Sequence, residues 1–243
     1  VTGIAIAAIV TAAAFFLFSG RDTIDSAISE FEAGDYDDAL RILNRIVVTS
    51  DYDMAEKIHY YRCKSINRFA QELEDRFEDE LKAAASDNQN SAERDSEKKY
   101  VERKLAGINA RFGTDLVLTA DKSRARIIPG GRFYQEFVSK FRGSQYIEDL
   151  DFEEVERAAA SDRERFLGLL VHYYSRYPAT PYLSELVKML LDNLGRGGVT
   201  LAGREEFLNG MIISFCRKYP TSSEFHRFFT CTGESVNFRD SPS

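Results

Sequence analysis

The first eighteen residues constrain the fold more than any other stretch, because residues 1–18 carry no charge. As a helix with a rise of about 1.5 Å per residue, this run is about 27 Å long, close to the roughly 30 Å hydrocarbon core of a bilayer. We therefore expect a single transmembrane anchor at residues 1–19. The alternatives are a cleaved signal peptide and a buried core helix. Bulky side chains before Ser19 disfavour a small-x-small cleavage site.

The charges after the apolar run predict its orientation. Residues 21–40 hold seven acids and a single base, Arg21. Flanks that cross the membrane are the ones that lack Lys and Arg. We therefore expect the C-terminal part outside the cytoplasm, in the periplasm of a Gram-negative cell. The sequence begins with Val1 and not with a methionine, so we also expect a leader or short tail before it.

Composition disfavours several classes of function. The formal net charge of −7 does not suit non-specific binding of nucleic acid. The three cysteines, Cys63, Cys216 and Cys231, form no C-x-x-C motif and have no histidine pair beside them for zinc. A bridge between Cys216 and Cys231 is one alternative, and unpaired core thiols are the favoured one. We predict no metal and no other cofactor.

Helical periodicity begins directly after the anchor. Asp22 is placed to cap a helix from Ile24 that ends at Gly34, and Asp53 with Glu56 has the spacing of a capping box for a third helix. The second helix, between them, has apolar residues three and four positions apart on one face. These residues are Tyr36, Ala39, Leu40, Leu43 and Ile46.

Four of these positions resemble a tetratricopeptide repeat. Gly34, Tyr36, Ala39 and Leu43 match the G-x-Y-x-x-A-x-x-x-L core of such repeats. The resemblance implies that residues 22–66 form a helical hairpin in which small residues let the helices approach closely and the aromatic ring fills the gap. One repeat cannot bury its own face, so further hairpins are implied. An ordinary helical hairpin is the alternative.

Residues 67–112 predict a long helix and an antiparallel partner. The third helix continues to about Ala85, the polar SDNQNS at 86–91 breaks it, and a second helix runs from about Ala92 to a stop at Gly113. We interpret the many charges of this arm as a solvated face. The apolar stripes are Ile58, Tyr61, Ile66, Phe69, Leu73, Phe77 and Leu81, then Val101, Leu105, Ile108 and Phe112.

Residues 113–134 interrupt the helical pattern. LVLT at 116–119 and RARIIP at 124–129 suit a short β-hairpin, and an irregular loop is the alternative. A basic segment begins here. It is either a docking surface for an acidic partner or lipid headgroups, or an internal balance for the acidic arm. Its residues are Lys122, Arg124, Arg126, Arg132, Lys140 and Arg142.

Residues 135–243 contain an internal repeat. The stretch 163–183 realigns with 204–225, so that Tyr177-Pro178 matches Tyr219-Pro220 at a period of 42. Because the residue before proline leaves the helical region, each Tyr-Pro pair predicts a helix end. The expected helices are 163–174, 181–194, 204–216 and 222–229, an α-solenoid. The turns also resemble those of periplasmic tetratricopeptide-like proteins of envelope assembly and cell division.

Candidate catalytic residues give no motif. His59, His172 and His226 are scattered, and we expect His172 to be a packing residue in an apolar helix. Ser175 and Cys216 lack a nucleophile elbow. We interpret the glycine-rich 195–204 stretch as a hairpin connection, with an anion site as the alternative. Glu153 and Glu154 are expected on a surface-like helix.

The predicted fold is all-α, with a transmembrane helix, tetratricopeptide-like hairpins and a hairpin or irregular insertion near 114–132. The expected function is a membrane-anchored adaptor or scaffold that binds other proteins of an envelope complex, such as a flagellar-motor, secretion, pilus or division assembly. We do not expect an enzyme. The alternative is an envelope enzyme with its active site under the 113–132 or 195–204 loop. Self-association is left open.

Overall fold

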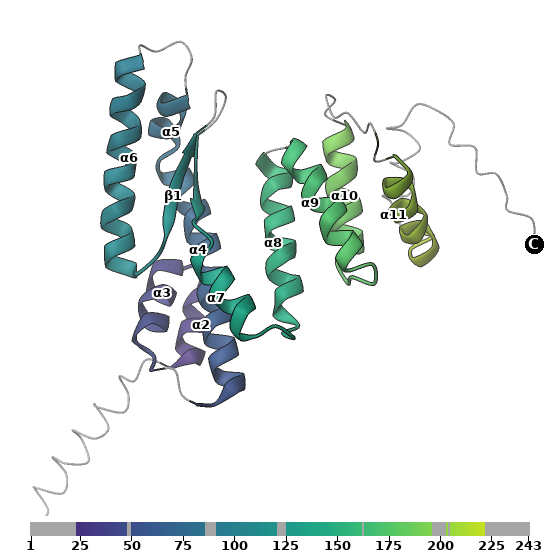
Figure 1. Cartoon of the computed structure of the whole chain (residues 1–243), viewed down its shortest axis with the longest axis horizontal. Helices are drawn as coiled ribbons and strands as arrows, with labels where there is room; N and C mark the ends of the chain where they lie inside the picture. Colours follow the sequence, from purple (N-terminus) through teal and green to yellow (C-terminus); the bar gives the residue numbers. More distant parts are fainter. Residues whose placement is uncertain are drawn as a thin grey trace, which may run out of the picture. The chain divides into compact units, whose positions relative to one another are not determined.

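The computed structural model describes residues 23–47, 50–85, 91–120, 125–161, 163–195, 203 and 205–221. The chain divides into two compact units, Val1–Ser144 and Gln145–Ser243. The described residues are mostly helical, with one two-stranded sheet (Figure 1). The predicted anchor lies outside them. No helix within these ranges is long and apolar enough to span a membrane.

The first unit begins with a short helical hairpin, α2 (Ile24–Ala33) and α3 (Tyr36–Arg45). The predicted cap, Asp22, is wrong: Thr23 is the cap, and its Oγ1 accepts a hydrogen bond of 3.1 Å from the Ser26 backbone N–H. Gly34 ends α2 with φ of 90°, a conformation that favours glycine because it has no Cβ. The predicted turn at Gly34 is therefore confirmed.

The third helix, α4 (Tyr52–Arg76), starts earlier than expected. Asp51 caps it by accepting a hydrogen bond of 3.1 Å from the Met54 backbone N–H, so the predicted Asp53–Glu56 capping box is wrong. Asp53 instead lies in the first turn, where a negative charge is favourable near exposed N–H groups. The apolar stripe continues, as expected, across a break at Phe77 into α5 (Glu78–Ala85).

A β-hairpin lies between the long helices of this unit. Strands β1 (Leu116–Ala120) and β2 (Ala125–Pro129) pair antiparallel, with Leu118 opposite Ile127, so the structure has the hairpin and not the irregular loop. Helix α6 (Ser91–Phe112) packs against α5 and β1, while β2 lies along α4 (Figure 1). The predicted arm is therefore present where α5 packs on α6, and the sheet lies between α6 and α4.

Buried and exposed side chains alternate along the strands, which explains how the hairpin packs between the helices. Leu116 and Ile127 are 2% and 1% exposed, whereas Val117 is 43% exposed, so alternate residues face the helices. The inward side chains join Phe69, Leu73 and Leu105 in one apolar core. The final helix of this unit, α7 (Arg132–Lys140), packs on α4.

The second unit contains four described helices. They are α8 (Tyr146–Ser161), α9 (Arg163–Arg176), α10 (Leu183–Gly195) and α11 (Glu205–Lys218). Helices α9 and α11 end directly before Tyr177 and Tyr219, as the Tyr-Pro pairs predict. At both ends the tyrosine N–H donates a hydrogen bond of 2.8 Å, to the carbonyl of Tyr173 or Phe215. The expected helix at 222–229 lies outside the described residues.

Candidate functional site

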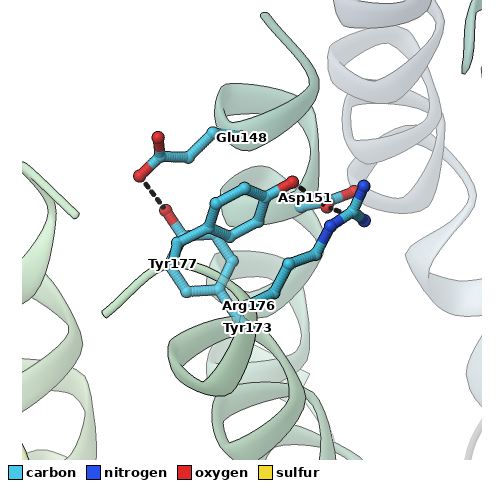
Figure 2. Close-up of polar contacts among 5 residues, drawn as sticks. All are labelled: Glu148, Asp151, Tyr173, Arg176 and Tyr177. Carbon is cyan, nitrogen blue, oxygen red and sulfur yellow. Dashed lines mark hydrogen bonds and ion pairs between the residues drawn. The ribbon is translucent and has the colours of Figure 1, made fainter. Parts of the chain in front are cut away.

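Tyrosines near the first Tyr-Pro turn contact the acids of α8. Tyr177 Oη donates a hydrogen bond of 2.8 Å to Asp151 Oδ2, and Tyr173 Oη donates one of 3.2 Å to Glu148 Oε1 (Figure 2). Tyr182, just before α10, donates one of 2.8 Å to Asp149 Oδ1. We call these six residues the tyrosine–carboxylate cluster: Tyr173, Tyr177, Tyr182, Glu148, Asp149 and Asp151. It fixes the turn between α9 and α10 to the first turns of α8.

Arg176 and Thr180 complete this arrangement. The Arg176 guanidinium lies 2.9 Å from Asp151 Oδ2, so this carboxylate receives both a cation and the Tyr177 hydroxyl (Figure 2). The buried Thr180 Oγ1 lies 2.9 Å from Tyr173 Oη and accepts a hydrogen bond of 3.2 Å from the Tyr182 backbone N–H. The turn that follows Pro178 is therefore stabilised by hydrogen bonds among its own residues as well as by contacts with α8.

Burial sets the charge state of the cluster. It raises the pKa of Tyr173, Tyr177 and Tyr182 above the ordinary value, and the neighbouring carboxylates raise each pKa further because they disfavour a second negative charge. For Tyr173 the hydrogen bond with Thr180 acts in the opposite direction. Each phenol thus stays neutral at neutral pH and acts as a donor. Such phenols bind neighbouring helices and do not supply a phenolate base.

The side chains at the two Tyr-Pro turns are arranged alike. The Tyr173 and Tyr177 rings lie 5.0 Å apart, and the Phe215 and Tyr219 rings lie 5.2 Å apart. Arg176 lies over the Tyr177 ring at 5.2 Å, and Lys218 lies over the Tyr219 ring at 5.3 Å. Pro178 and Pro220 are exposed after each ring. The internal repeat therefore extends from the backbone to the contacts of its side chains.

The residues that resemble a tetratricopeptide repeat lie in the first unit. Ala39 and Leu43 are both 0% exposed on α3. The Tyr36 ring lies 5.5 Å from Phe31, whose ring lies 5.7 Å from Tyr61. One aromatic group thus joins α2, α3 and α4, with small and branched apolar side chains between these helices.

The basic segment is only partly described. Lys122 and Arg124 lie outside the described residues, and Arg126 is half-buried on β2. Arg132 donates a hydrogen bond of 3.0 Å from Nη2 to the Gly113 carbonyl. Lys140 forms a salt bridge of 2.7 Å with Glu136. Arg142 is exposed after α7. At least two of these bases contact their own chain, and both interpretations of the segment stay open.

Two expectations about buried polar groups are wrong. His172 is exposed, because the buried face of α9 passes through Phe166, Leu170 and Tyr173. Glu153 is 5% exposed and not on the surface, because Phe152 and Val155 turn the same side of α8 inward. The other member of that pair, Glu154, is exposed and pairs with Arg165 at 2.7 Å.

Of the two histidines that the structure describes, His59 is the buried one. It is 5% exposed, and its ring lies 5.6 Å from the Phe141 ring. Burial lowers its pKa, and the positive charges of Lys140 and Arg62 lower it further, whereas Glu136 opposes them. His59 is therefore neutral at neutral pH and packs between α4 and the end of α7.

The remaining candidates show no catalytic geometry. Ser175 Oγ donates a hydrogen bond of 2.7 Å to the Val171 carbonyl one turn earlier. Cys216 is half-buried, and burial raises its pKa. His226 and Cys231 lie outside the described residues, as does most of the 195–204 stretch. In the part of the chain that is described, no group of three His, Cys, Asp or Glu could hold a metal ion.

No protein-family model, curated protein or solved structure matches this chain.

Proposed function

We propose that this protein is a membrane-anchored adaptor whose helical hairpins dock other proteins of a cell-envelope complex. The uncharged run at residues 1–18 would be its anchor, and the acids that follow favour a domain outside the cytoplasm. A flagellar-motor, secretion, pilus or division assembly would suit such an adaptor.

The observation that carries this proposal is the pair of matched Tyr-Pro turns in the second unit. The ends of α9 and α11 match in their backbone hydrogen bonds and ring contacts, and repeat proteins bind partners across surfaces built from such equivalent elements. Glu164 and Glu206, Gly168 and Gly210, and Arg176 and Lys218 are exposed pairs 42 positions apart. The outer faces of α9 and α11 therefore carry the same or similar side chains at these equivalent positions.

The tetratricopeptide resemblance of residues 22–66 supports the same function. Ala39 and Leu43 are fully buried beside two neighbouring helices, and Gly34 makes the turn with positive φ. We propose that α2 and α3 form one hairpin of this type, with α4 as the first helix of the next. In such arrays each hairpin needs its neighbour to bury its apolar face.

The test is an affinity purification of the full chain from detergent-solubilised membranes, followed by identification of stoichiometric partners. A double variant, His172→Glu with Ile213→Glu, changes exposed side chains of α9 and α11. We expect it to lose partners that the native chain retains. Arg103→Glu, at an exposed position on α6, is the matched control and should retain them. If the native chain captures no stoichiometric partner, including a second copy of itself, the adaptor is refuted.

The basic segment is a second candidate docking surface, for an acidic partner. Its exposed described residues are Arg132, Lys140 and Arg142. Arg142→Glu leaves the contacts of Arg132 and Lys140 in place, and it should reduce partner capture and reduce the dependence of capture on salt. If this variant captures the same partners with the same salt dependence, the bases balance the protein's own acids.

A further inference from the structure

Exposed apolar side chains gather at one end of the first unit. Six large hydrophobic residues of the described chain are exposed, and three of them lie within eight positions of each other. Val47 is 82% exposed, Tyr52 57% and Met54 39%. We call these three residues the apolar tip. The others, Tyr100, Val117 and Ile213, are separate. Apolar side chains exposed at one end of a unit are favoured where an apolar surface covers them.

The order of the helices places this tip beside the start of the described chain. Helices α2, α3 and α4 pack on one another as consecutive antiparallel elements. The end of α3, the start of α4 and the start of α2 therefore share one end of this helical array, opposite the Gly34 turn (Figure 1). Val47 follows α3, Tyr52 begins α4, and Thr23 precedes α2 at this same end.

The apolar run ends close to this point in the sequence. Thr23 follows Phe18 by five positions. Five residues span at most about 18 Å even when fully extended. If residues 1–18 cross a bilayer, the tip cannot lie far from the membrane surface. Tyrosine is enriched at the level of the lipid headgroups, and apolar side chains beside it can be buried at the boundary between headgroups and acyl chains.

The charges around the tip are mixed. Asp25, Asp51 and Asp53 are exposed at this end, and so are the bases Arg45 and Lys57. Lys140 and Arg142 are exposed on either side of Phe141, whose ring lies 5.2 Å from the Tyr52 ring. Because acids and bases nearly balance, the tip gains little attraction to an anionic surface, and a zwitterionic surface accepts its apolar side chains.

We propose that the apolar tip of Val47, Tyr52 and Met54 is a membrane-contact surface that inserts among zwitterionic headgroups beside the anchor. This proposal rests on the proposed anchor at residues 1–18. It adds that the anchored unit lies with this end against the bilayer, so that the tip limits how freely the unit turns about its tether.

The absence of tryptophan from the sequence allows a direct test. Val47→Trp and Tyr52→Trp each place a sole tryptophan in the tip. Tyr100→Trp is the matched control, at a side chain that is 40% exposed on α6. Tyr100 lies twelve residues, about 18 Å of helical rise, before the end of α6 at Phe112, whose carbonyl accepts a hydrogen bond from Asn44 near the end of α3.

The full-length variants are reconstituted into phosphatidylcholine vesicles that contain brominated acyl chains, and flotation is followed by fluorescence. We expect all variants to float. Val47→Trp and Tyr52→Trp should shift to shorter wavelength and lose fluorescence to the bromine, whereas Tyr100→Trp should do neither. Quenching should not increase when phosphatidylglycerol replaces phosphatidylcholine, because the charges around the tip nearly balance.

Other results overturn the proposal in different ways. If the variants float but the tip tryptophans are quenched no more than Tyr100→Trp, the tip does not meet lipid and the anchor stands. A shift to shorter wavelength without quenching would mean that protein, such as a second copy, covers the tip. If the full chain does not float, the anchor fails and the proposed function fails with it.

Discussion

Removing one hydroxyl from the tyrosine–carboxylate cluster should loosen the second unit measurably. Tyr177→Phe deletes the donor that lies 2.8 Å from Asp151 Oδ2 and keeps the ring against Tyr173 at 5.0 Å. The substitution creates no large cavity, because only one atom is lost. Its effect therefore reports the hydrogen bond itself.

The expected magnitude follows from the partners of Asp151. A hydrogen bond to a charged group stabilises a protein by about 1.5 to 3 kcal/mol. Asp151 keeps the Arg176 guanidinium at 2.9 Å, so its charge is not left without a partner. Tyr177 is also only half-buried. We therefore expect the lower end, about 1.5 kcal/mol, or roughly a tenfold rise in the population of the open state.

Hydrogen exchange of the full chain, analysed by peptides of α8 and of the 177–182 turn, measures this directly. Local opening is reported helix by helix, so the first unit serves as an internal control. Tyr182→Phe removes the equivalent donor to Asp149 and should accelerate exchange at the same end of α8. Unchanged exchange of α8 in both variants would refute the idea that these hydroxyls hold the helices together.

Three further predictions concern backbone, packing and charge. Gly168→Ala and Gly210→Ala should each slow hydrogen exchange of their helices by about fivefold, or about 1 kcal/mol, because alanine favours a helix and the new Cβ meets nothing within 4 Å. Gly34→Ala also has open space around the new Cβ, but it should destabilise α2 because the φ of Gly34 is +90°. Ala39→Leu should lower the midpoint of thermal unfolding of the first unit, because overpacking a fully buried site costs about 1 to 3 kcal/mol. An unchanged midpoint would contradict close packing of the helices around Ala39. The pKa of His59 is lowered in the folded state from the ordinary value of 6.5, so its contribution to stability is present above about pH 6.5 and is lost as the pH falls below 6.5. His59→Gln should therefore flatten the dependence of the unfolding free energy on pH below about 6.5.

Features set by local chemistry could be predicted from the sequence. Gly34 and Gly113 end helices with positive φ, and Tyr177 and Tyr219 follow helix ends because each precedes a proline. The apolar stripe through Ile58, Phe69 and Leu73 is buried for the same reason: helical periodicity fixes which side chains share a face.

Features set by distant contacts could not be predicted. His172 lies among apolar residues along the sequence and Glu153 among charged ones, yet His172 is exposed and Glu153 is buried, because which face of α8 and α9 turns inward depends on their neighbours. The sheet between the long helices likewise depends on side chains of α4 and α6. The cap at Asp51 was missed because several acids at this boundary can occupy a cap.

The tyrosine–carboxylate cluster was also missed, although its members carry a signal. Tyr173 and Tyr177 are four positions apart and so share one face of a helix end, and Glu148, Asp149 and Asp151 occupy the first turns of α8. The tyrosines do not predict their acidic partners, nor the acids theirs, unless it is already known that α8 and α9 pack together. Paired aromatic and acidic sets at the ends of adjacent helices are a usable signal in chains of this kind.

The cluster links stability to the proposed function. Binding orders side chains and loops, and the free energy spent on that ordering is subtracted from affinity. A turn already fixed by Thr180, by three tyrosine hydroxyls and by Arg176 presents the outer face of α9 in one conformation, so less ordering remains to be done on binding. Tyr177→Phe lies apart from the exposed His172 on that helix, yet it should weaken partner capture by the adaptor. A variant that loosens α8 in exchange experiments without weakening capture would mean that partners bind elsewhere, and the first unit would then be the surface to test.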